Sequence, residues 1–153
     1  MAHETLLKYI AAVNAHDPEA IYGLMGEDFE FVDTYGNEIH GPHEMKQSWT
    51  GYFTWFPDYH IEVMDIIGDG EKAAVFGFAS GAYRGRAART NLDTYWRLPA
   101  AWRAVERGGK IRFWQVVCDS KIPFDVMDKA GRAAVPPVNP GLRDGSWAPS
   151  LDR

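Results

Sequence analysis

Two aspartates stand at the ends of apolar, strand-like segments and are the first candidates for chemistry. Side chains alternate along a strand, so Asp33 shares a face with Phe31, and Asp119 shares one with Phe113 and Val117. Burial at the end of such a stripe would raise the pKa of a carboxyl and make it a general acid or base near neutral pH. The alternative is that both strand ends meet solvent and the aspartates only cap turns.

Large aromatic rings are frequent and could form the walls of a pocket. The chain of 153 residues has six Trp, seven Tyr and eight Phe, and rings of this size either fill a core or line a cavity. The same rings could instead be plain core packing. The residues expected to bind a substrate are Trp49, Tyr52, Phe53, Phe56, Trp96 and Trp102.

Other reactive groups give weaker signals. His40 and His43 are three residues apart with Glu44 beside them, but Gly and Pro intervene and no further metal ligand is evident. Cys118 follows two valines, which favours inert packing over nucleophilic catalysis. No glycine-rich turn leads into a helix as a phosphate-binding loop does. We therefore expect no metal site and no cofactor.

The charge balance limits the kinds of partner. A net charge of −5 provides no positive field for a phosphate backbone, so we expect no nucleic acid. Arg84, Arg86 and Arg89 form a local basic run, interpreted as a solvated loop or, alternatively, as an anion-binding edge. One cysteine allows no intrachain disulfide, and no segment approaches a membrane span of about 20 apolar residues. We expect a cytoplasmic protein.

The first half of the chain predicts three helices and a strand. Apolar residues at helical spacing indicate a helix over 5–16, and a second helix restarts at Asp17-Pro18 and stops at Gly26. From residue 28 the period becomes two, which is typical of a half-buried strand. A third helix begins near Pro42, carries an aromatic stripe and ends before Pro57.

The second half predicts a run of strands over 59–67, 72–83, 91–105 and 111–119. Short glycine-rich connections between them favour an antiparallel meander. Gly77, Gly81 and Pro99 lie inside strands and indicate bends that would curl the sheet around a concave face.

The composition changes near the C-terminus and divides the chain. Residues 1–128 form one α+β domain, long enough to bury a single core. Residues 129–153 are rich in Gly and Pro and are expected to be an extended tail.

Several local strings, in this order, resemble a known family. They are Asp17-Pro18-Glu19-Ala20, a Phe-rich strand ending in Asp33, Gly41-Pro42, Phe56-Pro57-Asp58-Tyr59, Gly68-Asp69-Gly70, Gly81-Ala82-Tyr83-Arg84-Gly85, and Gly109-Lys110-Ile111 leading to Trp114 and Asp119. Over residues 3–128 the chain resembles the SnoaL-like branch of the nuclear transport factor two-like superfamily. The resemblance implies a cone-shaped α+β barrel, in which N-terminal helices pack in a strongly curved antiparallel sheet around a deep apolar pocket.

The resemblance also implies possible activities. Its members include polyketide cyclases, isomerases, epoxide hydrolases, dehydratases and non-enzymatic binding modules. In the cyclases an aspartate on the last strand is the acid or base, and Asp119 is its nearest match, although it lies one position farther beyond Trp114 than in the cyclases. Either a bulge absorbs the extra residue or Asp119 points away from the pocket.

Two functions therefore remain open. One is a cofactor-independent isomerase or cyclase that acts on a small hydrophobic, ring-containing or polyketide-like molecule, with Asp119 moving the proton and Asp33 assisting. The other is a ligand-binding or dimerisation module without turnover. By analogy with the family, a homodimer is expected in either case.

Overall fold

Three helices precede most of the sheet in the computed structural model, which describes residues 2–84 and 94–129. They are α1 (Glu4–Asn14), α2 (Pro18–Leu24) and α3 (Pro42–Trp55). All three lie where the apolar periodicity predicts them, and α3 ends before Pro57 as expected. No helix in the described ranges is long and apolar enough to cross a membrane.

The start of α2 follows the expected capping chemistry. The carboxylate of Asp17 accepts a hydrogen bond from the backbone N–H of Ala20 at 3.1 Å, and Pro18 occupies the first helical turn. The prediction that Gly26 ends this helix is wrong, because the helix ends two residues earlier and Gly26 lies in the following strand. A Cβ at Gly26 would lie 2.4 Å from the Arg112 guanidinium, so a larger residue there would require the Arg112 side chain to shift.

Both ends of α1 are attached to the sheet by polar side chains. The carboxylate of Glu106 accepts hydrogen bonds from the N–H groups of Thr5 and Leu6 at 3.3 and 3.4 Å, where the helix dipole favours negative charge. At the other end, the Asn14 amide donates to the carbonyl of Ile61 and accepts from its N–H, at 3.0 and 2.8 Å. Asn14 thereby pairs with an edge strand and fixes α1 across the sheet.

In the described part of the chain, six strands form one curved open sheet in the order β2-β1-β6-β5-β4-β3. The strands are β1 (Met25–Val32), β2 (Glu38–His40), β3 (His60–Asp69), β4 (Lys72–Ala82), β5 (Tyr95–Arg107) and β6 (Lys110–Cys118). The meander predicted for β3 to β6 is confirmed, since each pairs antiparallel with the next. The parallel pairing of β1 with β6 and the short strand β2 were not predicted.

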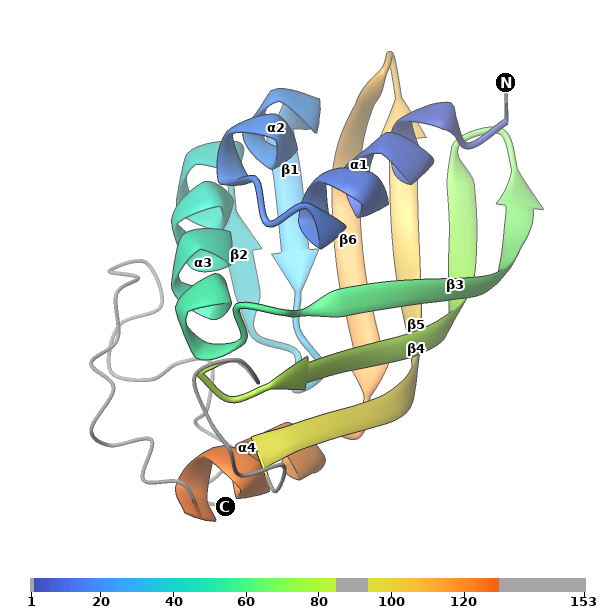
Figure 1. Cartoon of the computed structure of the whole chain (residues 1–153). Coiled ribbons are helices and arrows are strands. Elements are labelled where there is room, and N and C mark those ends of the chain that lie inside the picture. Colours follow the sequence, from blue (N-terminus) through green and yellow to red (C-terminus); the bar gives the residue numbers. More distant parts are fainter. Residues whose placement is uncertain (1, 85–93, 130–153) are drawn as a thin grey trace.

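The sheet bends where β3 and β4 pair irregularly. The register between the two strands shifts between Val63 and Asp65, opposite Gly77. A Cβ at Gly77 would lie 1.8 Å from the carbonyl oxygen of Glu62, so only glycine fits at this bend. Figure 1 shows β3, β4 and β5 turning sharply along their length. The expected curled sheet is therefore present, with α1 and α3 on its concave side.

A fourth helix, α4 (Lys121–Lys129), follows the last strand and was not predicted. It lies at the end of the sheet opposite α1 and α2 (Figure 1). Its apolar side chains Pro123, Phe124 and Met127 are buried, and the Phe124 ring packs edge to face against Trp55 with centroids 6.5 Å apart. The expected C-terminal tail lies outside the described residues, apart from Lys129.

Candidate functional site

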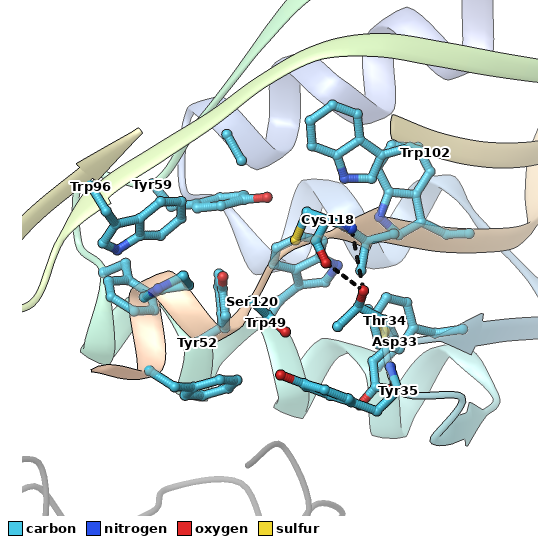
Figure 2. A pocket seen from close by; sticks show the side chains of 18 residues that line it. Asp33, Thr34, Tyr35, Trp49, Tyr52, Tyr59, Trp96, Trp102, Cys118 and Ser120 are labelled. Carbon is cyan, nitrogen blue, oxygen red and sulfur yellow. Dashed lines mark hydrogen bonds between the residues drawn. The ribbon is translucent and has the colours of Figure 1, made fainter. Parts of the chain in front are cut away.

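A cavity of about 60 Å³ lies between α3, the concave face of the sheet and α4. Figure 2 shows the side chains that surround it. Most of them are aromatic or aliphatic. The lining residues are Phe31, Asp33, Thr34, Tyr35, Met45, Trp49, Tyr52, Phe56, Tyr59, Ala79, Trp96, Trp102, Trp114, Val116, Cys118, Ser120, Pro123 and Phe124.

The aromatic stripe of α3 divides between the cavity and the rest of the core. Trp49, Tyr52 and Phe56 line the cavity, as predicted from their spacing of three and four residues. The expectation that Phe53 also lines it is wrong. The Phe53 ring stacks on Trp49 with centroids 5.4 Å apart and contacts the His16 ring at 5.0 Å, on the side of α3 that faces the end of α1.

Trp96 and Trp102 reach the cavity because β5 alternates regularly. Even-numbered residues of this strand are buried from 96 to 104, and odd-numbered ones are more exposed. The Trp102 ring stacks on Trp114 at 6.3 Å, and the Trp96 ring packs edge to face on Phe56 at 5.2 Å. Both tryptophans were predicted to line the pocket, and both do.

The phenols of Tyr52 and Tyr59 and the thiol of Cys118, all beside the cavity, are held in their neutral forms. Burial disfavours phenolate and raises the pKa values of Tyr52 and Tyr59 above their ordinary value of 10.0. Burial, together with the negative charge of Asp119, raises the pKa of the Cys118 thiol to about 11. A neutral thiol is a poor nucleophile, so the interpretation of Cys118 as inert is consistent with its surroundings.

Asp33 is the carboxylate that lines the cavity in the described residues, and only 5% of it is exposed. Its oxygens accept three hydrogen bonds from the loop between β1 and β2. The N–H groups of Tyr35 and Asn37 each donate at 2.8 Å, and the side-chain amide of Asn37 donates at 2.9 Å. The carboxylate therefore shapes this loop, and the residue also lines the cavity.

Asp119 does not lie in the cavity, contrary to the expectation for it. Its side chain is exposed and accepts a hydrogen bond from the Lys121 N–H at 3.2 Å, at the start of α4. The pairing of β6 with β5 is regular from Phe113 to Cys118, so no bulge absorbs the extra residue. The bulge lies earlier, between Ile111 and Phe113, and it turns Asp119 outward.

The same register brings different residues inward. Trp114, Val116, Cys118 and Ser120 line the cavity from β6 and the start of α4. Thr34 fixes this end of the strand, since its hydroxyl donates to the Cys118 carbonyl at 2.8 Å and accepts from the Cys118 N–H at 3.2 Å (Figure 2). Sequence reasoning missed Ser120, although counting every second residue from Trp114 would have found it.

Tyr59 is a further lining residue that the sequence analysis left out. It follows the helix-ending turn Phe56-Pro57-Asp58, and its N–H donates to the Phe56 carbonyl at 3.0 Å. Its ring packs edge to face on Tyr52, with centroids 5.1 Å apart. The apolar and aromatic residues around this turn were a usable signal, but the direction of the ring depends on the turn.

His40, His43 and Arg84 do not line the cavity. His40 pairs with Glu30 and Glu38 at 3.2 Å each on the exposed side of β1 and β2. Within residues 2–84 and 94–129, no group of three His, Cys, Asp or Glu side chains is placed to hold a metal ion. Arg84 lies over the Tyr83 ring at 5.4 Å, while Arg86 and Arg89 lie outside the described residues.

Solved structures share this fold at low sequence identity. A putative SnoaL-like polyketide cyclase from Shewanella denitrificans aligns with a TM-score of 0.69 and 13% identity, over 83% of this chain and 96% of that one. TerC, co-crystallised with polyporic acid, aligns with a TM-score of 0.67 and 20% identity, over 82% and 96%. A protein of ketosteroid isomerase-like fold from Catenulispora acidiphila, in complex with trimethylamine, gives 0.65 and 19%, over 76% and 85%.

The family assignment comes from the sequence match itself. No curated protein matches the chain. The SnoaL-like domain family matches residues 6–114, from α1 to the middle of β6, which is most of the described domain. The solved structures add that the architecture is the nuclear transport factor two-like fold. The chain belongs to the SnoaL-like domain family.

Proposed function

We propose that the cavity binds a small, hydrophobic, ring-containing molecule. The observation that carries this proposal is a partly open space walled by aromatic rings from α3, β5 and β6. Such rings favour planar apolar ligands, and a few polar groups among them would set the orientation. Asp33 is the one acidic side chain that lines the cavity in the described ranges, and no described Lys, Arg or His lines it. The site therefore suits an uncharged molecule better than an ion.

The solved relatives support a small ligand without identifying it. The Catenulispora protein was crystallised with trimethylamine and TerC with polyporic acid. These molecules differ in size and chemistry, so neither is transferred to this chain. Both proteins were crystallised with a small molecule, and the cavity described above is where we propose that one binds in this chain.

The ligand would enter by displacing side chains of α4. Pockets for drug-sized ligands have volumes of about 300–1,000 Å³, whereas the present cavity holds about 60 Å³. Pro123 and Phe124 line it from α4. We propose that these two residues move outward when the ligand binds.

A filled-cavity variant tests the binding proposal. Ala79→Leu adds a side chain to the concave face of β4, at a lining residue that is 3% exposed. If crowding by the added side chain costs the bound ligand about 1–3 kcal/mol, we expect about 5- to 150-fold weaker binding of 1-tetralone, a neutral bicyclic ketone, measured by ligand-observed NMR. Ala74→Leu, on the other face of β4, is the matched control and should bind normally. Equal binding by both variants would place the ligand elsewhere.

Acid/base turnover at Asp33 is a second candidate function. The observation that favours it is a nearly buried acidic residue in the lining of an apolar cavity. Such a group could move a proton on a bound ketone without a cofactor, as an isomerase or a cyclase requires. The three hydrogen bonds from its own loop hold the carboxylate in place. In this second function Asp33, and not Asp119, would move the proton.

We also propose that the domain forms a homodimer through the outer face of the sheet. A shallow apolar depression lies there, lined by residues that include Met64, Phe76, Pro99 and Val117. Three of these side chains are about half exposed, at 59%, 45% and 55% for Met64, Phe76 and Val117. Ion-paired Arg97 and Glu62 carry both signs of charge at its side, which suits contact with an identical surface.

A further inference from the structure

Two buried polar groups beside the cavity have no hydrogen-bond partner. They are the indole N–H of Trp96 and the hydroxyl of Ser120, and neither meets a donor or acceptor in the described residues. Both residues line the cavity, and Trp96 is only 4% exposed. Buried polar groups are nearly always paired in folded proteins, because an unpaired one loses its hydration without compensation. A molecule in the cavity is therefore the natural partner.

The two groups reach the cavity from separate elements. Trp96 stands near the start of β5, and its ring is held between Phe56 at 5.2 Å and Tyr59 at 6.2 Å. Ser120 lies between β6 and α4, one pleat beyond Cys118. In Figure 2, Trp96 and Asp33 lie on opposite sides of the cavity, with Ser120 between them. An oxygen bound near Trp96 and Ser120 would thus lie away from the carboxylate.

The hydrogen-bonding properties of these two groups, together with the charges near them, limit which kind of ligand can bind. An indole N–H only donates, so it needs an acceptor atom, and a serine hydroxyl can donate to the same atom. An organic anion would share the cavity with the Asp33 carboxylate, and no described Lys, Arg or His lines the cavity to offset its charge. A cation would find no partner in the Trp96 N–H. An uncharged carbonyl oxygen meets all these conditions.

Within the proposed binding function, we infer that the ligand is a neutral ring ketone or quinone whose carbonyl oxygen accepts hydrogen bonds from Trp96 Nε1 and Ser120 Oγ. The rings of Phe56 and Tyr59 hold the Trp96 indole in place, and the other aromatic walls pack on the ligand ring. Trp96 and Ser120 thereby distinguish a ring ketone from a hydrocarbon of the same shape.

A matched pair of probes tests this inference. 1-Tetralone and tetralin share a bicyclic frame, and only the ketone has an acceptor oxygen. For the wild-type protein we expect the ketone to bind more tightly by about 2- to 10-fold for each hydrogen bond formed. Trp96→Phe and Ser120→Ala should each reduce that preference while leaving the affinity for tetralin within about twofold. Trp55→Phe removes an indole that does not line the cavity and should keep the full preference.

A spectroscopic readout gives a result even if a variant fails to fold. The indole N–H resonance of Trp96 in the wild-type protein should move downfield with 1-tetralone and not with tetralin. Equal affinities for the two probes, or an unmoved Trp96 resonance, would overturn the inference and leave the binding proposal standing, with a water molecule pairing the two groups. Failure of both probes to bind would overturn the binding proposal as well.

Discussion

At the residue scale, Asp33 and Asp119 show how strand register decides whether a carboxylate can act on a ligand. Both follow strands in which large apolar side chains alternate. Asp33 lines the cavity and is almost fully buried, whereas Asp119 is exposed and caps the start of α4. A carboxylate outside the cavity cannot transfer a proton to a ligand that it does not touch. Proton transfer, if the domain performs it, belongs to Asp33.

Substitution of the two aspartates should therefore affect the rate of proton exchange differently. If Asp33 is a base, the wild-type protein accelerates hydrogen–deuterium exchange at the carbon next to the carbonyl of 1-tetralone, measured by NMR in D₂O. Asp33→Asn should lower the rate by about 10²- to 10⁴-fold, the usual contribution of a general base. The amide keeps one oxygen to accept from Tyr35 and Asn37, so the loop should fold.

Asp119→Asn is the matched control and should leave the exchange rate unchanged. The absence of any acceleration by the wild-type protein would rule out Asp33 as a base for this ketone and leave the binding proposal intact. A loss of exchange in Asp119→Asn with normal rates in Asp33→Asn would reverse the assignment.

At the scale of elements, α4 controls the size of the cavity. It follows β6 after a short connection, and its described side chains Pro123 and Phe124 close the cavity on one side. Its ion pair, between Lys121 and Asp125, joins two residues of the helix itself. Apolar contacts such as that of Phe124 with Trp55 help to attach α4, and we expect a ligand that fills the same space to replace them.

Removal of the Phe124 ring should lower the stability of the fold and raise the affinity for a ligand. Phe124 is 4% exposed, so Phe124→Ala is expected to lower the free energy of unfolding by about 3–5 kcal/mol, measured with denaturant. The space that it leaves should allow 1-tetralone to bind without displacing the ring, so the affinity should rise.

Ile122→Ala, at an exposed position of the same helix, is the control and should change stability by less than about 0.5 kcal/mol. Weaker binding by Phe124→Ala, with the fold intact, would mean that the ring packs on the ligand and is not displaced by it.

At the scale of the whole molecule, the two faces of the sheet have different roles. The concave face packs against α1 and α3 and lines the cavity. The convex face presents the apolar depression around Phe76 and Val117, with no element of the described chain covering it. Because exposed apolar patches of this kind mark contact surfaces, the second face is the one that would pair with another copy.

A charge placed in that depression should separate the dimer. Val117→Glu buries a carboxylate against an apolar surface in the proposed interface, and Leu7→Glu adds the same charge to an exposed position of α1. Light scattering after size-exclusion chromatography should give a dimer for the wild-type protein and Leu7→Glu, and a monomer for Val117→Glu. A monomeric wild-type protein would show that the depression has another use.

Local sequence patterns predicted most of the helices and strands and one wall of the cavity. Apolar spacing placed α1, α2 and α3, the Asp17-Pro18 pair placed a helix start, and alternation with short glycine-rich turns placed the meander of β3 to β6. The same spacing identified Trp49, Tyr52 and Phe56 as one wall. These features depend on residues close together in the chain, where the periods of helix and strand fix which side chains share a face.

Tertiary structure alone decided the rest. The parallel pairing of β1 with β6 joins segments about 80 residues apart, and the bulge between Ile111 and Phe113 exists only because β6 pairs with β5. That bulge shifts every later side chain of β6 by one position, which turns Asp119 outward and brings Ser120 to the cavity. Periodicity within one segment contains no information about its register against a distant strand. The sequence therefore indicated a pocket, and the strand register in the folded protein determined which polar side chains line it.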